Sequence, residues 1–299
     1  MSQKCHDRSA EDIGNIISLE HLNLTVPDHD LASLFYITGL GLTRDPYMDF
    51  GIFRNIWVNI GEQQFHLPKS DPQRFRGSIG LVLPDLDALE KRLSEVGRAL
   101  SGTLYSWDIK DHWIEVTGPW GNQFICHGPE FASDREDYRY PAKPGPGLGL
   151  VYLETRVPVG TAAGIARFYT DVFRAPAELL ESDNLTAAIR MGGYQTLRFR
   201  EVEAAEDDYD KHHIAIYLAN FSGPYEWLVD KGLITEESDR HQYRFQTLID
   251  PKSGQALYEL EHEVRSLQHP LYNRNLVNRN ASQDFFSFRK SREAFVPEL

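Results

Sequence analysis

The chain is poor in cysteine, since only Cys5 and Cys126 occur among its 299 residues. One stands in a polar N-terminal stretch and the other in an apolar segment, so no disulfide framework is expected. Long hydrophobic runs are also missing, because none approaches the roughly 20 residues that a membrane span needs. The polar start MSQKCHDRSAEDIGN lacks the basic-then-apolar layout of a signal peptide. These absences predict a cytoplasmic protein that spans no membrane.

Positive charge is scarce as well. The chain has 31 Lys and Arg residues against 44 Asp and Glu residues, which gives a formal net charge of −13. Nucleic-acid binding depends on cations that face the phosphate backbone, and no basic stripe offsets the acidic balance. A hydrophobic content of 41% and an aromatic content of 12% are enough for real cores. We therefore expect a globular protein of about two domains whose partner is a small molecule or a protein.

One short pattern organises the chain. In residues 19–28, LEHLNLTVPD, apolar and polar residues alternate with the period of two that is typical of a half-buried strand. His21 therefore points to the face opposite the leucines. The Pro-Asp pair ends the strand, and the residues that follow predict a helix that closes at a glycine turn near residues 38–42.

The same layout returns three more times, starting near residues 77, 151 and 212. The third copy carries Phe168-Tyr169 in its predicted helix where the first copy carries Phe35-Tyr36. Three further strands follow each helix. The chain is therefore predicted to consist of four strand-helix-strand-strand-strand modules, related by internal repetition.

Composition divides the chain into five predicted parts. Residues 129–148 contain prolines, glycines and charges without periodicity, which is typical of a linker. The aromatic residues of the last segment predict that it packs on the body or on a second subunit of a homodimer. The parts are a disordered lead-in at 1–16, an N-terminal domain at 17–128, the linker at 129–148, a C-terminal domain at 149–262, and a tail at 263–299.

Four such modules, with HLNLTVPD opening the first and HHIAIYL opening the fourth, resemble the vicinal oxygen chelate (VOC) superfamily. Gly-Pro-Trp-Gly-Asn and Asp-Pro-Lys-Ser-Gly before final strands add to the resemblance, which covers roughly residues 17–262. The superfamily contains glyoxalase I, bleomycin- and fosfomycin-resistance proteins, and extradiol dioxygenases. The resemblance implies an α+β fold of two tandem glyoxalase-like domains, each a pair of βαβββ modules that form a curved mixed sheet cup. It also implies a divalent metal such as Fe²⁺, Mn²⁺, Zn²⁺ or Ni²⁺.

In that superfamily, metal ligands come from the first and last strands of paired modules. Carried over to this chain, the N-terminal positions are His21, His66, Ser78 and Ile125, and the C-terminal ones are Tyr152, Arg198, His213 and Tyr258. His127 lies two residues beyond Ile125 on the same strand face, which offers a shifted set of His21, His66 and His127. Glu259 and Glu261 could supply a carboxylate if the strand register differs by one, although such a shift turns every side chain to the other face.

Each of these residues also has a plainer interpretation. His21 and His66 could line a cup as hydrogen-bond donors, and His213 could be a satisfied core histidine. Both glutamates of the last strand could belong to a solvated face. Glu115 shares a strand face with Trp113, and as a desolvated carboxylate it is a candidate general base. The alternative for Glu115 is an exposed charged face.

Two function classes follow. The first is an enzyme of the glyoxalase or dioxygenase type, which acts on a small aromatic or apolar substrate with a divalent metal in one cup. The second is a metal-free protein of the bleomycin-resistance type, which sequesters such a ligand. The surviving histidines favour the enzyme, and the missing ligands favour the binding protein. A third, weaker hypothesis gives the C-terminal half and the tail a role in dimerisation.

Overall fold

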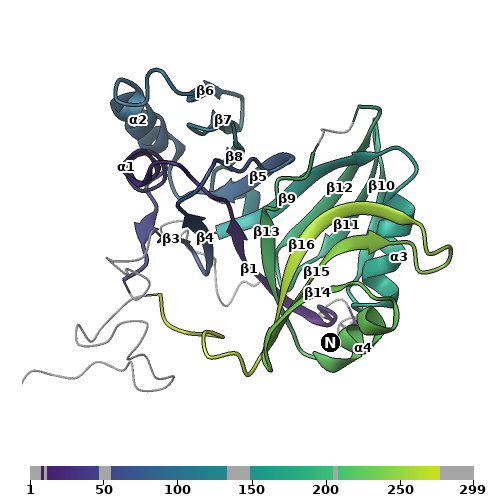
Figure 1. The fold of residues 1–299 in the computed structure, drawn as a ribbon. Coiled ribbons are helices and arrows are strands. Elements are labelled where there is room, and N and C mark those ends of the chain that lie inside the picture. The colour runs from purple at the N-terminus through teal and green to yellow at the C-terminus, as the bar shows by residue number, and fades with distance from the viewer. Residues whose placement is uncertain (1–7, 10–11, 47–54, 133–148, 205–207, 277–299) are drawn as a thin grey trace, which may run out of the picture.

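The computed structural model describes residues 8–9, 12–46, 55–132, 149–204 and 208–276. Within these residues the chain forms two eight-stranded mixed sheets and four α-helices (Figure 1). Strand, helix and three strands follow one another four times, as the repeat predicts. The expected α+β class, with two curved sheets that are each built from a pair of βαβββ modules, is confirmed.

The first sheet combines the first and fourth modules, in the strand order β14-β15-β16-β13-β1-β4-β3-β2. The first module contains β1 (Ile16–Asn23), α1 (His29–Ser33) with a π-helical turn at Leu34–Gly39, β2 (Thr43–Arg44), β3 (Asn55–Ile60) and β4 (Gln63–Pro68). The fourth contains β13 (His213–Leu218), α4 (Ser222–Asp230), β14 (Ile234–Asp239), β15 (Gln242–Ile249) and β16 (Ala256–Ser266).

The second sheet combines the second and third modules, in the order β10-β11-β12-β9-β5-β8-β7-β6. The second module contains β5 (Gly77–Val82), α2 (Leu86–Gly97), β6 (Ser106–Ile109), β7 (Trp113–Thr117) and β8 (Gln123–His127), and a short 3-10 turn follows at Pro129–Ala132. The third contains β9 (Gly149–Pro158), α3 (Ala162–Asp171), β10 (Ala177–Glu181), β11 (Leu185–Arg190) and β12 (Thr196–Val202).

This pairing corrects one expectation. Antiparallel pairing joins β1 to β13 and β5 to β9, so residues 17–128 and 149–262 do not each form a cup of their own. The physical reason is that the first strand of every module has a similar hydrogen-bonding edge. The alternation pattern of a strand does not specify which other module supplies the strand that pairs with this edge. Most of the predicted linker, residues 133–148, lies outside the described residues, as does most of the predicted lead-in.

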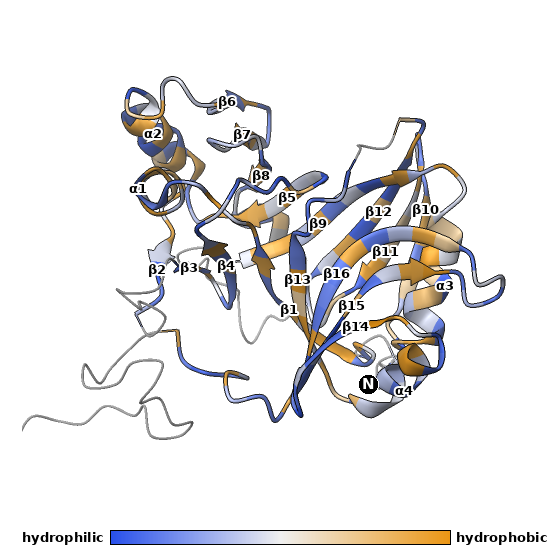
Figure 2. Ribbon diagram, in the orientation of Figure 1, coloured by the Kyte–Doolittle hydropathy of each residue, from blue (hydrophilic) through white to orange (hydrophobic). Residues whose placement is uncertain are grey.

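Alternation along the strands separates an apolar core from two polar faces, and Figure 2 shows hydrophilic and hydrophobic residues alternating along the strands. On β4, Phe65 is fully buried and packs 6.0 Å from Phe124 of β8, measured between ring centroids. Phe35, from the turn after α1, lies 5.4 Å from the same Phe124 ring. The two sheets therefore pack on each other through their apolar faces, and His66, next to Phe65, points to the other face of its sheet.

The predicted tail begins later than expected, because β16 continues through Ser266. Beyond that strand the chain crosses the polar face of the first sheet. Arg274 Nη2 lies 2.6 Å from Asp45 Oδ2 in a buried ion pair, and Asn59 Nδ2 donates to the Leu276 carbonyl at 3.3 Å. The described part of the tail thus packs on the body, and residues 277–299 lie outside the described part of the chain. No described helix has the length and apolar character required to cross a membrane.

Gln195, in the turn between β11 and β12, fastens the second sheet to the first. Its Nε2 donates to the carbonyls of Leu19 (2.9 Å) and Leu150 (3.1 Å), and its Oε1 accepts from the Leu19 amide at 3.1 Å. The side chain is buried, with 3% of its surface exposed. It therefore supplies hydrogen bonds that β1 would otherwise have to obtain from another strand.

We predict that Gln195→Leu lowers the free energy of unfolding by about 2 to 4 kcal/mol, because buried backbone groups lose their partners. Urea denaturation measures this change. The exposed Gln268 supplies a control, and Gln268→Leu is expected to stay within about 0.5 kcal/mol of the wild type. Equal effects of the two substitutions would show that the bridge contributes nothing.

Candidate metal centre

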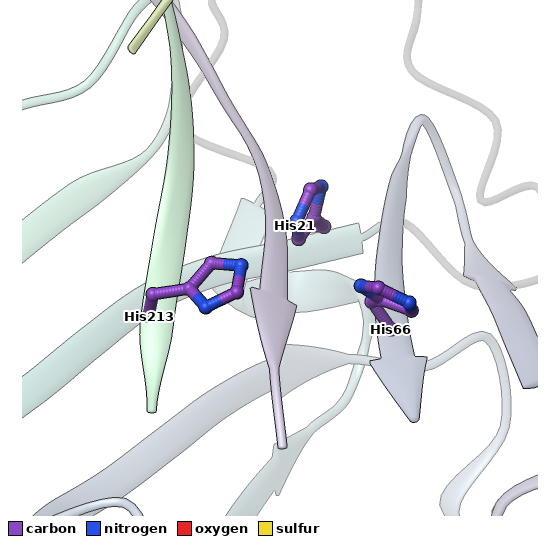
Figure 3. A group of neighbouring side chains, drawn as sticks. All are labelled: His21, His66 and His213. Atoms are coloured by element: carbon purple, nitrogen blue, oxygen red, sulfur yellow. The ribbon is translucent and has the colours of Figure 1, made fainter. Parts of the chain in front are cut away.

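Three histidines from adjacent strands meet on the polar face of the first sheet, which we call the histidine cup. His21 lies on β1, His66 on β4 and His213 on β13, and Figure 3 shows the three side chains grouped around β1. One nitrogen from each ring can be chosen so that all three lie within 4.8 Å of one another. Within the described residues, this is the group of histidine, cysteine or acidic side chains with the geometry to hold a metal ion.

The free nitrogens of the three rings are buried without partners. The Nε2 atoms of His21, His66 and His213 make no hydrogen bond, although buried polar atoms normally do. Burial lowers the pKa of His66 and of His213 well below the usual histidine value, and the neighbouring His21 lowers both further. Both rings are therefore neutral at pH 7, which is the form that ligates metals.

Glu20 orients His21. A bulge in the pairing of β1 with β13 between Leu19 and His21 allows Glu20 to approach its neighbour, and His21 Nδ1 lies 2.8 Å from Glu20 Oε2. Burial by itself raises the pKa of Glu20, but Arg265, 2.6 Å away, and His21 hold that pKa well below its usual range. A carboxylate behind the Nδ1 of an imidazole directs the Nε2 outward, as in carboxylate–histidine–metal arrangements.

His66 is held by stacking. Its ring lies on the indole of Trp57 with centroids 3.9 Å apart and planes 12° apart. Trp57 also meets His21 edge-on at 5.0 Å. Because Trp57 pairs directly with His66 across β3 and β4, the contact follows from the register of the hairpin.

The strand register identifies a fourth position. In the first module, His66 lies beside Asn23, two residues after His21, and in the fourth module Glu263 lies beside Ala215, two residues after His213. Glu263 is therefore the counterpart of His66 under the approximate two-fold symmetry of the sheet. One of its carboxylate oxygens lies 3.6 Å from His213 Nε2, and only 3% of the residue is exposed.

Two arginines neutralise Glu263. Arg265 Nη2 lies 2.5 Å from one carboxylate oxygen, and Arg244 Nη2 donates to the other. Burial raises the pKa of Glu263, but Arg265, His21 and Arg244 together lower it below the usual range. Glu263 is thus ionised, as a metal ligand must be, and already paired with cations.

Glu263 was not among the residues predicted from the sequence. The predicted last-strand position was Tyr258, because the alternation predicted a strand that ends near residue 261. The strand runs to Ser266, and the register places Glu261, not Tyr258, directly beside His213. The signal that could have found Glu263 is the alternation of Glu259, Glu261 and Glu263, which puts all three on one face.

Several predicted site residues lie elsewhere. His127 is on β8 in the second sheet, so the shifted set with His21 and His66 is wrong. Glu115 is also in the second sheet, where its side chain is 43% exposed, so it is neither desolvated nor close to the three histidines. Glu259 is exposed and accepts from Gln246 Nε2 at 3.0 Å. Glu261 lies behind the site, 3.6 Å from His213 Nδ1 and 2.6 Å from Arg244.

His262, a buried histidine outside the site, has a hydrogen-bond partner for each of its ring nitrogens. His262 is fully buried, with Nε2 2.6 Å from the Tyr169 hydroxyl and Nδ1 2.7 Å from the Leu260 carbonyl. Its ring stacks on Phe245. His212 has an unpartnered Nε2 as well, but its Nδ1 lies 2.6 Å from Asp210, and its ring packs against Phe75 and Tyr209. In the histidine cup, by contrast, three rings that each have an unpartnered Nε2 bring one nitrogen apiece within 4.8 Å of one another.

A cavity of about 510 Å³ lies where the tail crosses the first sheet, and its lining includes none of the three histidines. Glu20 and Gln64 line it from the sheet, and residues 271–276 line it from the tail. The rings of Tyr194, Tyr217 and Tyr272 also border it. Glu20, which contacts His21, is the lining residue that links this cavity to the histidine cup.

Among the residues that the structure describes, the second sheet has no such centre. The strand pairings that relate the four positions of the histidine cup relate four equivalent positions in the second sheet. These positions hold Ser78, Ile125, Tyr152 and Arg198, as the sequence predicts. None of the four is a histidine or a carboxylate. We call this face, which carries Tyr152, Arg198 and Arg200, the arginine cup.

The fold is shared with solved structures. The chain aligns with glyoxalase I from Zea mays at a TM-score of 0.57 and 13% identity, over 83% of this chain and 92% of that one. It aligns with a candidate dioxygenase from Bacillus subtilis subsp. subtilis str. 168 at a TM-score of 0.55 and 12% identity, over 85% and 86%. No family model and no curated sequence matches the chain. The expected glyoxalase-like fold is thereby confirmed.

Burial of His262 makes stability depend on pH. Burial lowers its pKa from 6.5 to about 3, so below pH 6.5 the unfolded chain takes up a proton that the folded protein refuses. Stability is full above pH 6.5 and falls as the pH drops. Between pH 6.5 and 5, we expect the wild type to lose about 2 kcal/mol more than His262→Gln, measured by urea denaturation. Parallel losses in both proteins would contradict this assignment.

Proposed function

We propose that the histidine cup binds one divalent metal ion through His21, His66 and His213, with Glu263 as the fourth ligand, and that the chain is an enzyme of the glyoxalase or dioxygenase type. The convergence of three imidazole rings, each with a buried Nε2 that has no hydrogen-bond partner, carries the proposal. Buried nitrogens without partners cost free energy unless something binds them. The fold is compatible with this function but does not by itself imply it.

The donor set fits the expected metals. Imidazole and carboxylate ligands suit Fe²⁺, Mn²⁺, Zn²⁺ and Ni²⁺. When bound, such an ion supplies a Lewis acid for an oxygen-bearing substrate. Residues around the site orient two of the ligand histidines. Glu20 fixes the ring orientation of His21, and Trp57 stacks on His66. Burial keeps His66 and His213 neutral.

The cavity that Glu20 links to the histidine cup suits a small organic substrate, since pockets of this size accommodate molecules of that class. Its three tyrosine rings match an aromatic portion, and the amides and charges around Gln64 and Arg274 match polar substituents. The lining is more polar than a purely apolar substrate would need. We therefore propose a substrate that combines a ring with hydrogen-bonding groups.

One observation favours the metal-free alternative. Arg244 and Arg265 already bind both oxygens of Glu263, and a metal would have to compete with them for this carboxylate. A protein of the bleomycin-resistance type, which binds its ligand without metal, needs no such exchange. Metal content separates the two functions.

Metal analysis is the first test. After purification from metal-supplemented medium, we expect about one equivalent of metal in the wild type. We expect at least about tenfold less in His21→Ala, His66→Ala and His213→Ala, because each variant loses a ligand. The exposed His112 provides the matched control, and His112→Ala should keep its metal. A folded wild type without metal would move the assignment to the binding protein.

A second prediction concerns Glu20. Without this carboxylate, the His21 ring loses its orienting partner, so Glu20→Ala is expected to bind metal about 10 to 100 times more weakly. Titration against a competing chelator measures the affinity, and circular dichroism checks the fold. The exposed Glu178 on β10 serves as the control through Glu178→Ala. Unchanged affinity in Glu20→Ala would remove the carboxylate from the proposed site.

A further inference from the structure

The centre of the arginine cup is filled by a ring where the histidine cup has its converging nitrogens. Tyr152 stands at the position of His213, directly opposite Gly80 of β5. A Cβ atom on Gly80 would lie 2.3 Å from the Tyr152 ring, so only glycine allows the ring to lie across the strand. In the first sheet the residue at the Gly80 position is Asn23. The Tyr152 hydroxyl lies 3.1 Å from His127 Nε2, which fixes the ring further.

One side of the arginine cup carries three arginines. Arg198 lies over the Tyr152 ring with its Cζ 4.1 Å from the centroid, and Arg156 and Arg200 face each other across β9 and β12. On this face of the two strands, both of which are described in full, the one carboxylate is Glu154. It lies 3.9 Å from Arg198 and 3.8 Å from Arg200, too far for a hydrogen bond.

The other side is aromatic and amide-lined. Trp113 of β7 and His127 and Gln123 of β8 face the cup. The carboxylate on this side, Glu115, accepts from Trp113 Nε1 at 3.2 Å and lies 3.6 Å from Lys110, so it is compensated locally. A cavity of about 460 Å³ lies between the two sides, with Ser78 on its floor.

We propose that the arginine cup is a second, metal-independent binding site, and that it takes a small aromatic carboxylate. The guanidinium group of Arg200, which lines the cavity, presents planar donors that suit a carboxylate. The rings of Tyr152 and Trp113 provide the surface for the aromatic part. The site does not depend on the function proposed for the histidine cup, because its residues belong to the other sheet.

Benzoate is the probe, and benzamide, which has the same shape without the charge, is its control. With the full chain, isothermal titration calorimetry is expected to show benzoate binding and at least about tenfold weaker benzamide binding. Arg200→Gln should weaken benzoate binding by about tenfold. The Arg200 side chain is 44% exposed, so the variant is expected to fold. The exposed Arg240 gives the matched control, Arg240→Gln, which should bind like the wild type.

His21→Ala separates this site from the histidine cup. If benzoate binds in the arginine cup, the His21→Ala variant retains the wild-type affinity for benzoate, whether or not the histidine cup of that variant binds metal. Loss of benzoate binding in His21→Ala with no change in Arg200→Gln would overturn the proposal. So would benzamide binding as tightly as benzoate, inorganic phosphate competing at equal concentration, or a wild type that binds no benzoate at millimolar concentration.

Discussion

The pairing of β1 with β13 is the interaction on which the histidine cup depends. It places Asn23 opposite His213 and Ala215 opposite His21, so the two rings lie on one face at a fixed offset. The outer strands β4 and β16 then add His66 and Glu263 in the same relative positions. Backbone hydrogen bonds thus set the geometry of the site, and Glu20, Trp57 and the two arginines refine the orientation of individual side chains.

The second sheet repeats the strand arrangement of the first sheet but carries different side chains at the equivalent positions. The same strand register defines four equivalent positions in each cup. The histidine cup has three histidines and a glutamate at these positions, and the arginine cup has Ser78, Ile125, Tyr152 and Arg198. Because the backbones are equivalent, the difference lies in the side chains at a few positions. Gly80 is an instructive case, since the absence of its side chain decides where the Tyr152 ring lies.

Much of this was readable from the sequence, and the limits have physical causes. Alternation around His21 predicted its strand and its face, the repeat predicted four modules, and the equivalent positions in the second sheet were correct. The union of His21 and His66 with His213 was not predicted, because a strand pattern does not name its partner. Glu263 was missed because charged residues on the cup face obscure the end of β16. The bounds of the edge strands β10 and β14 were not predicted, because nearly all of their residues are exposed and no alternation marks them.

The pairing of outer modules also has a consequence for the order in which the protein forms during synthesis. The second sheet draws on a continuous stretch of chain, so its long-range contacts become available before the fourth module has left the ribosome. The first sheet must wait, with β1 and β4 already made and their inner edge open, until β13 arrives. An incomplete chain therefore presents two of the histidines but not the third, and the complete centre exists only once nearly all of the described chain has been translated.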